Sequence, residues 1–127
     1  MGVGLIKFQS LVNIIKGFKL NCAPSRESDI EIALENFLKS HGLPVKRQFQ
    51  IQNGRLDLVV DSIIIEVKKV GQKSIAEQLD KYSGHCNGLI VVCWRATGPL
   101  KMIFAVEKKT SKIPVELIEV RRSCGMI

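Results

Sequence analysis

The sequence predicts an α/β domain in which helices flank a central mixed β-sheet. Three observations support this fold class. Segments whose apolar residues recur at helical spacing alternate along the chain with short apolar runs typical of strands. The run Leu89–Trp94 is unbroken by polar residues, as in a strand that is buried on both faces. With 127 residues, of which 46% are hydrophobic, the chain has room for one core, so we expect a single domain over residues 1–127.

The N-terminal segment predicts an amphipathic helix at about residues 4–20. Its apolar residues recur at helical spacing, namely Phe8, Leu11, Val12, Ile15 and Phe18. Polar residues such as Lys7 and Asn13 interrupt the segment, so we expect neither a signal peptide nor a membrane span. The helix is therefore expected to pack on the domain or on a second subunit, with a role at a membrane surface as the less favoured alternative.

A second helix is expected after the break at Ala23–Ser25. Its apolar residues lie on one side, and the pattern ends at His41-Gly42. Ser28 and Glu31 have the spacing of a capping box at the start of this helix.

Three strands follow, because apolar residues alternate or run together between turn signals, at Val45–Ile51, Leu56–Val60 and Ile63–Lys68. Asn53-Gly54 and Asp61-Ser62 supply the two turns. The same patterns then predict a helix over Lys73–Tyr82 and strands over Leu89–Trp94, Lys101–Val106 and Val115–Val120.

The charge balance favours a polyanionic partner. Nineteen Lys and Arg residues against twelve Asp and Glu give a net charge of +7. Basicity alone does not separate DNA, RNA and anionic lipid. The four cysteines are widely spaced without a CxxC pair, so a structural zinc site is not expected. We expect Cys93 to be a small core residue and the protein to be cytoplasmic, in a reducing setting.

Two carboxylates and a lysine interrupt strands that are otherwise apolar. Glu66 and Lys68 share one face of their strand, because side chains alternate. If the two strands pair around a two-residue turn at Asp61-Ser62, Asp57 lies opposite Glu66. Two oxygen ligands at one point suit magnesium or manganese. An exposed Glu66 and Lys68 pair on an edge strand is the alternative, but it would not explain Asp57.

These residues resemble the active-site signature of the PD-(D/E)XK nuclease superfamily. Gly54-Arg55-Leu56-Asp57, eight intervening residues and Glu66-Val67-Lys68 correspond to its D…ExK pattern, although Leu56 stands where the motif has proline. The expected element order is similar to the family's restriction-endonuclease-like αβββαβ core over about residues 27–95. Gln78, on the next expected helix, resembles a downstream glutamine that assists DNA or metal binding in the family.

The resemblance implies a metal-dependent endodeoxyribonuclease that hydrolyses DNA phosphodiester bonds with Mg²⁺ or Mn²⁺. Asp57, Glu66 and the Val67 carbonyl would hold the metal ion, and Lys68 would orient water or stabilise developing charge. In archaeal Holliday junction resolvases a glutamate of the first helix completes the metal site, and Glu31 lies on the matching helix here.

Three of these assignments leave alternatives open. Glu31 is also the expected capping-box residue, and Glu35, one turn further, is its substitute in the site. Gln78 is equally well interpreted as a solvent-exposed helix residue. Tyr82 is expected to be a packed aromatic residue with its hydroxyl group at the rim.

DNA is the expected partner. The residues expected to hold it are Lys46, Arg47, Arg55, Lys69, Lys73 and Tyr82. Branched or Holliday-junction DNA is the preferred substrate, and we expect a homodimer because cutting two strands requires two active sites. The N-terminal helix and the strand Val115–Val120 are the expected contact surfaces. No membrane and no organic cofactor is expected, and the alternative function is a non-catalytic DNA-binding or assembly module that keeps the nuclease fold.

Overall fold

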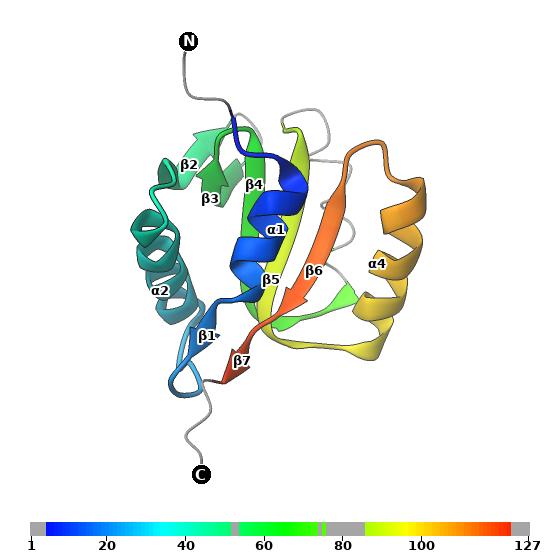
Figure 1. Cartoon of the computed structure of the whole chain (residues 1–127). Helices are drawn as coiled ribbons and strands as arrows, with labels where there is room; N and C mark the ends of the chain where they lie inside the picture. Colours follow the sequence, from blue (N-terminus) through cyan, green and yellow to red (C-terminus); the bar gives the residue numbers. More distant parts are fainter. Residues whose placement is uncertain (1–4, 52–53, 74, 76–85, 123–127) are drawn as a thin grey trace.

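A five-stranded sheet forms the centre of the molecule (Figure 1). The computed structural model describes residues 5–51, 54–73, 75 and 86–122. The strands lie in the order β2-β3-β4-β5-β6. Their bounds are Val45–Ile51 for β2, Gly54–Val60 for β3, Ile63–Gly71 for β4, Gly88–Ala96 for β5 and Val115–Glu119 for β6.

The sheet is mixed, as predicted. β2, β3 and β4 are antiparallel neighbours, whereas β4, β5 and β6 run parallel to one another. A second, two-stranded parallel sheet pairs β1 (Lys19–Leu20) with β7 (Arg121–Arg122), and the sequence patterns did not indicate it. The two sheets and the helices around them confirm the α/β class.

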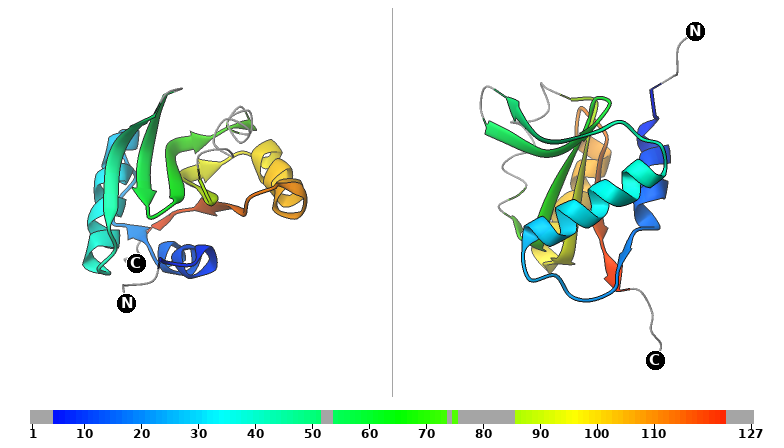
Figure 2. Two further views of the ribbon diagram at one scale, coloured as in Figure 1. Left: turned by 90° about the horizontal axis from the view of Figure 1, so that it is seen from above. Right: turned by 90° about the vertical axis from the view of Figure 1, so that its left-hand side faces the viewer.

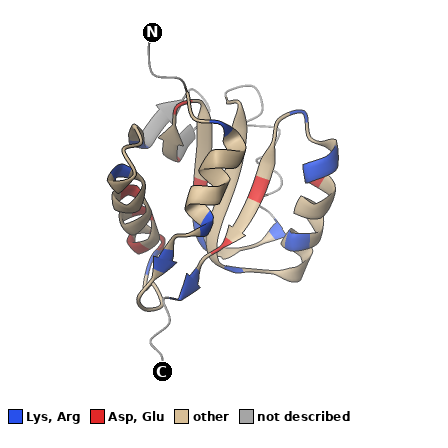
Figure 3. Ribbon diagram, in the orientation of Figure 1, with Lys and Arg blue, Asp and Glu red and all other residues tan. Residues whose placement is uncertain are grey.

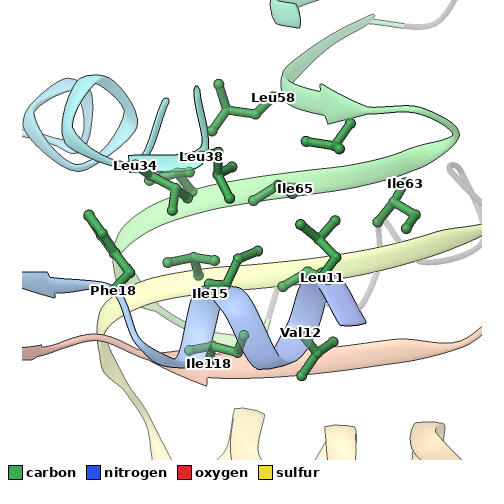
Figure 4. Packing of buried hydrophobic residues seen from close by; sticks show 14 of the residues in the cluster. Leu11, Val12, Ile15, Phe18, Leu34, Leu38, Leu58, Ile63, Ile65 and Ile118 are labelled. Carbon is green, nitrogen blue, oxygen red and sulfur yellow. The ribbon is translucent and has the colours of Figure 1, made fainter. Parts of the chain in front are cut away.

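Three helices of the described chain cover the two faces of the large sheet (Figure 2). α1 (Phe8–Lys16) and α2 (Glu27–Ser40) lie on one face, and α4 (Gly98–Thr110) lies on the other. Each face has its own apolar cluster. The first cluster, shown in Figure 4, joins α1 and α2 to alternate residues of β3, β4 and β5, and the second joins α4 to the residues between them.

The apolar side of α1 is used inside its own chain. Leu11, Val12 and Ile15 are fully buried in the first cluster. The helix is shorter than the predicted segment 4–20, and the contact surface expected for a second subunit is covered by the protein itself. The other expected contact, β6, lies at an edge of the sheet.

The start of α2 differs from the prediction. The Oδ2 atom of Asp29 accepts hydrogen bonds from the backbone N–H groups of Ser25 and Arg26, each at 3.0 Å. The predicted capping box of Ser28 and Glu31 is therefore wrong, because the helix begins at Glu27 and Asp29 occupies its third position. The end agrees with the prediction, since Gly42 has a φ of +78°, a left-handed conformation that glycine adopts readily.

The segment predicted as a strand over Lys101–Val106 is wrong, because it lies within α4. The Oγ1 atom of Thr97 accepts a hydrogen bond from the N–H of Leu100 at 3.4 Å, and a proline occupies the first turn. Leu100 and Phe104, four residues apart, are both buried against the sheet. The cap, the proline and the four-residue spacing favour a helix over the strand that the alternation between Lys101 and Val106 predicts.

The helix predicted over Lys73–Tyr82 falls mostly outside the described residues. Of that segment the structure describes an exposed Lys73 and a buried Ile75. Among the described helices, none combines the length and the apolar character needed to cross a lipid bilayer.

Candidate active site

The pairing of β3 with β4 has the register that the sequence predicts. Leu58 lies opposite Ile65, and Val60 lies opposite Ile63, on either side of a two-residue turn. Asp61, the first turn residue, has a φ of +53°, and its Oδ2 accepts a hydrogen bond from the N–H of Ile6 at 2.9 Å. This bond holds the turn against the N-terminal segment.

The pairing ends one residue before Asp57 and Glu66 would face each other. Beyond Leu58 and Ile65, the next contact between the two strands is made by a side chain. The Oδ2 of Asp57 accepts a hydrogen bond from the N–H of Val67 at 2.8 Å. In a strand the N–H and C=O of one residue point to the same neighbouring strand. The Val67 carbonyl therefore also faces the β3 side, as the predicted ligand set requires.

Asp57, Glu66 and Lys68 share one face of the sheet. On β4, Ile65 and Val67 belong to the cluster under α1 and α2, so Glu66 and Lys68 point to the opposite face. On β3, Leu58 belongs to the same cluster as Ile65 and Val67, which assigns Asp57 to the face of Glu66. Asp57, Glu66 and Lys68 therefore all lie on the face of the sheet that α4 covers.

Their burial differs along the strand. Glu66 is only 4% exposed, whereas Asp57 and Lys68 are half-buried. A carboxylate that is buried in its ionised form needs a cation or several hydrogen-bond donors nearby. Two carboxylates and a backbone carbonyl, beyond the point where the pairing of β3 with β4 ends, form an oxygen-rich donor set of the kind that Mg²⁺ and Mn²⁺ prefer, and Lys68 adds a cation beside it.

The third predicted carboxylate has a partner elsewhere. Within the described ranges, no three His, Cys, Asp or Glu side chains gather closely enough to hold a metal ion. Glu31 is 6% exposed, and its Oε1 lies 3.7 Å from the Nε of Arg47 on β2. The Nη1 of Arg47 also lies 3.9 Å from the Oε1 of Glu35, whose Oε2 is 2.9 Å from the Nζ of Lys39. Glu31, and Glu35 as the alternative to it in the predicted site, thus both lie within ion-pair distance of Arg47 on β2.

Arg47, which the sequence suggested as a DNA contact, is directed toward α2. Its side chain is 30% exposed and lies within ion-pair distance of two glutamates. Residue alternation could not indicate this, because the contact depends on how α2 packs on β2.

The other predicted DNA contacts lie in different surroundings. Lys46 and Lys73 are exposed. Lys69 is exposed as well, and its Nζ donates a hydrogen bond to the carbonyl of Ser25 at 3.2 Å, just before α2. The remaining predicted residues, whose side chains lie outside the described part of the chain, are Arg55, Gln78 and Tyr82.

Cys93 lies directly beside the candidate site, because it is paired with Lys68 in the register of β4 and β5. It is fully buried, as predicted for a core residue. Burial, together with the charge of Glu119, raises the pKa of the Cys93 thiol to about 11. The thiol is therefore protonated at neutral pH, and its position suits packing rather than nucleophilic chemistry.

Comparison with protein-family models, with curated proteins and with solved structures found no match to this chain.

Proposed function

We propose that the protein is a metal-dependent endodeoxyribonuclease of the PD-(D/E)XK type. The observation that carries the proposal is the end of the β3–β4 pairing, where Asp57 and Glu66 come to one face of the sheet beside Lys68. This is the arrangement that the D…ExK resemblance requires. The excess of basic residues, a net charge of +7, supports a nucleic-acid substrate.

In this proposal Asp57, Glu66 and the Val67 carbonyl hold a Mg²⁺ or Mn²⁺ ion. Such an ion polarises a scissile phosphate and lowers the pKa of a bound water. The bond from Val67 N–H fixes one oxygen of Asp57 in place. An ionised carboxylate has about four acceptor positions, so this bond leaves capacity for an ion. Lys68, one pleat beyond Glu66, orients the attacking water or stabilises the negative charge that develops on phosphate.

The finer parts of the proposal concern substrate and assembly. Branched DNA, including Holliday junctions, is the preferred substrate because the compact basic domain is similar to archaeal junction resolvases. Cutting two arms requires two sites, so we propose a homodimer. With the apolar side of α1 buried in the chain itself, β6 is the contact surface that remains, because it lies at an edge of the sheet.

One observation favours the alternative, a DNA-binding or assembly module without cleavage. The hydrogen bond between Asp57 Oδ2 and Val67 N–H stands in the place of a backbone hydrogen bond between β3 and β4. An aspartate with a purely structural role would make the same bond. Only a measurement of chemistry separates the two functions.

The test is cleavage of supercoiled, flapped and four-way-junction DNA with Mg²⁺ or Mn²⁺. Glu66→Gln keeps the shape but removes the charge, so we expect cleavage to fall at least 100-fold and Mn²⁺ binding, followed by calorimetry, to weaken. Lys68→Met should lose cleavage while it still binds Mn²⁺. Glu107→Gln, on α4, is the matched control and should leave both unchanged.

Two results would reject the nuclease. One is near-normal cleavage by Glu66→Gln, purified away from host nucleases. The other is an absence of metal-dependent cleavage by the unmodified protein on all three substrates, which would favour the non-catalytic module.

A further inference from the structure

A groove of about 750 Å³ lies at the β6 edge of the sheet. Its apolar residues Phe18, Trp94 and Ile118 belong to the face opposite to Asp57, Glu66 and Lys68, and Glu119 reaches it from the other face. It runs from the C-terminal end of α1 across the ends of β5 and β6 to β7. The residues that matter for its chemistry are Lys16, Phe18, Lys19, Trp94, Glu119 and Arg121. None of them belongs to the site described above.

The groove carries an excess of positive charge. Lys16, Lys19 and Arg121 are all exposed, and within the described part of the chain none of them is in ion-pair distance of an acid. Figure 3 shows the basic residues of β1 and β7 beside the end of α1. The parallel pairing of Lys19 with Arg121 holds two of the cations on adjacent strands.

The acid in the groove does not cancel this charge. The Oε2 of Glu119 accepts a hydrogen bond from the N–H of Ala96 at 2.8 Å, and its Oε1 lies 3.5 Å from the Nζ of Lys101. Lys101 stands outside the groove lining and already balances Glu119. Three cations are therefore left facing solvent around one cavity.

The groove also has an aromatic wall. Trp94, the chain's single tryptophan, is half-buried against the first apolar cluster and lines the groove. Phe18 supports the floor, since it is buried and its ring centroid lies 5.3 Å from that of Phe37. A rigid indole beside cations can stack on a base while the cations contact the backbone phosphates.

We propose that this groove binds a segment of single-stranded nucleic acid. Lys16, Lys19 and Arg121 contact its phosphates, and a base lies against Trp94. A duplex turns its base faces inward and cannot use the tryptophan, and the acidic side chains of a peptide have no aromatic ring to stack on it. The combination of unbalanced cations with an aromatic wall thus favours an unpaired strand.

The position of the groove relates it to the proposed nuclease site, although it goes beyond that function and stands without it. Lys68, Cys93 and Glu119 form one row across β4, β5 and β6. With neighbouring strands about 4.8 Å apart, Lys68 and Glu119 are separated by about 10 Å across the sheet. An unpaired arm of a branched DNA could therefore pass from one face to the other around this end of the sheet.

The first test uses Trp94 as its own reporter. The unmodified protein, in a chelator so that no cleavage occurs, is titrated with a ten-nucleotide oligothymidine while tryptophan fluorescence and the anisotropy of a labelled strand are followed. We expect quenching that saturates together with the anisotropy. An abasic strand of the same length should cause at most a third of that quenching, and a matched duplex or poly-glutamate none.

The second test removes the charge. Lys19→Ala with Arg121→Ala should weaken oligothymidine binding at least tenfold and lower the slope of log affinity against log salt by about 1.4, the loss of two phosphate contacts. Lys109→Ala with Lys112→Ala removes the same charge away from the groove and should weaken binding less than twofold. Circular dichroism establishes that both double variants are folded.

Four results would overturn the proposal. They are no binding of oligothymidine, binding without quenching, equal quenching by the abasic strand, duplex or poly-glutamate, and equal losses in the two double variants. These outcomes are independent of the nuclease proposal, because every measurement is made in chelator. Conversely, loss of cleavage in Glu66→Gln leaves this binding unchanged.

Discussion

Asp57→Asn and Asp57→Ala are expected to lose the same activity but different amounts of stability. The Oδ2 of Asp57 accepts the N–H of Val67 at 2.8 Å in a half-buried position. Asparagine keeps an acceptor there but removes the charge. A hydrogen bond to a charged group contributes about 1.5–3 kcal/mol and a neutral one about 0.5–1.5 kcal/mol, so the exchange costs about 1 kcal/mol. Relief of repulsion with Glu66 offsets part of this cost.

Alanine has no acceptor, so it withdraws the partner of the Val67 N–H altogether. Leaving this N–H without an acceptor lowers the free energy of unfolding by about 1–3 kcal/mol. We therefore expect urea denaturation to show a loss of less than about 1 kcal/mol in the free energy of unfolding for Asp57→Asn and a larger loss, of about 1–3 kcal/mol, for Asp57→Ala. Both variants should lose at least 100-fold in metal-dependent cleavage, because neither supplies a carboxylate.

Asp29 is a matched control for this experiment. Its Oδ2 also accepts backbone N–H groups, at the start of α2, but it takes no part in the proposed site. Asp29→Ala should cost about 1 kcal/mol, the usual effect of a lost cap, and leave cleavage intact. Equal stability of Asp57→Asn and Asp57→Ala would refute the role given to the hydrogen bond. Retained cleavage in Asp57→Asn would refute the catalytic role.

Three further outcomes follow from contacts described above or from close approaches in the core. Gly88→Ala would place a methyl group 2.4 Å from Cδ1 of Phe8, so a loss of about 1–3 kcal/mol is expected, and Phe8→Leu in the same chain should recover part of it in a double-mutant cycle. Because the pKa of Cys93 is raised to about 11 from 9.0, a variant with this single cysteine should react with a thiol reagent at a rate that still rises between pH 9 and 11. Its stability should fall over the same range, since the unfolded thiol ionises first; a rate that levels off at pH 9 would contradict the burial argument. Lys46→Ala should lower the salt slope of duplex binding by about 0.9. Arg47→Ala should lower the free energy of unfolding by about 1–2 kcal/mol, a buried-pair loss discounted for its partial exposure, and unchanged stability of this variant in urea would show that its pairs with Glu31 and Glu35 contribute nothing.

The antiparallel half of the sheet could be predicted because its signals are local. A two-residue turn determines the register of its hairpin, so Asp57 and Glu66 could be aligned from their distance to Asp61-Ser62 alone. Alternation along each strand then assigned Lys68 to the same face. Neither step needs knowledge of how distant elements pack.

The predictions were wrong where two local patterns indicated different structures, and incomplete where a contact depends on how a helix packs on the sheet. Lys101–Val106 alternates like a strand, yet the cap at Thr97 and the buried pair Leu100 and Phe104 make it helical. Similarly, two start signals overlap in α2, and Asp29 is the residue that caps the helix. The meeting of Glu31 with Arg47 joins a helix to a strand, and no spacing in the sequence could indicate it.

The central position of β5 has a consequence for the order in which the chain folds. The hairpins of β2, β3 and β4 join neighbours in sequence and close small loops, so they can form early. β5, which is buried along most of its length, receives its second neighbour only when β6 arrives after the whole of α4. During synthesis on the ribosome, the apolar edge of β5 therefore stays unpaired until α4 and then β6 have emerged. Variants that slow the docking of α4, rather than those that weaken the hairpins, are thus the ones that would aggregate during expression.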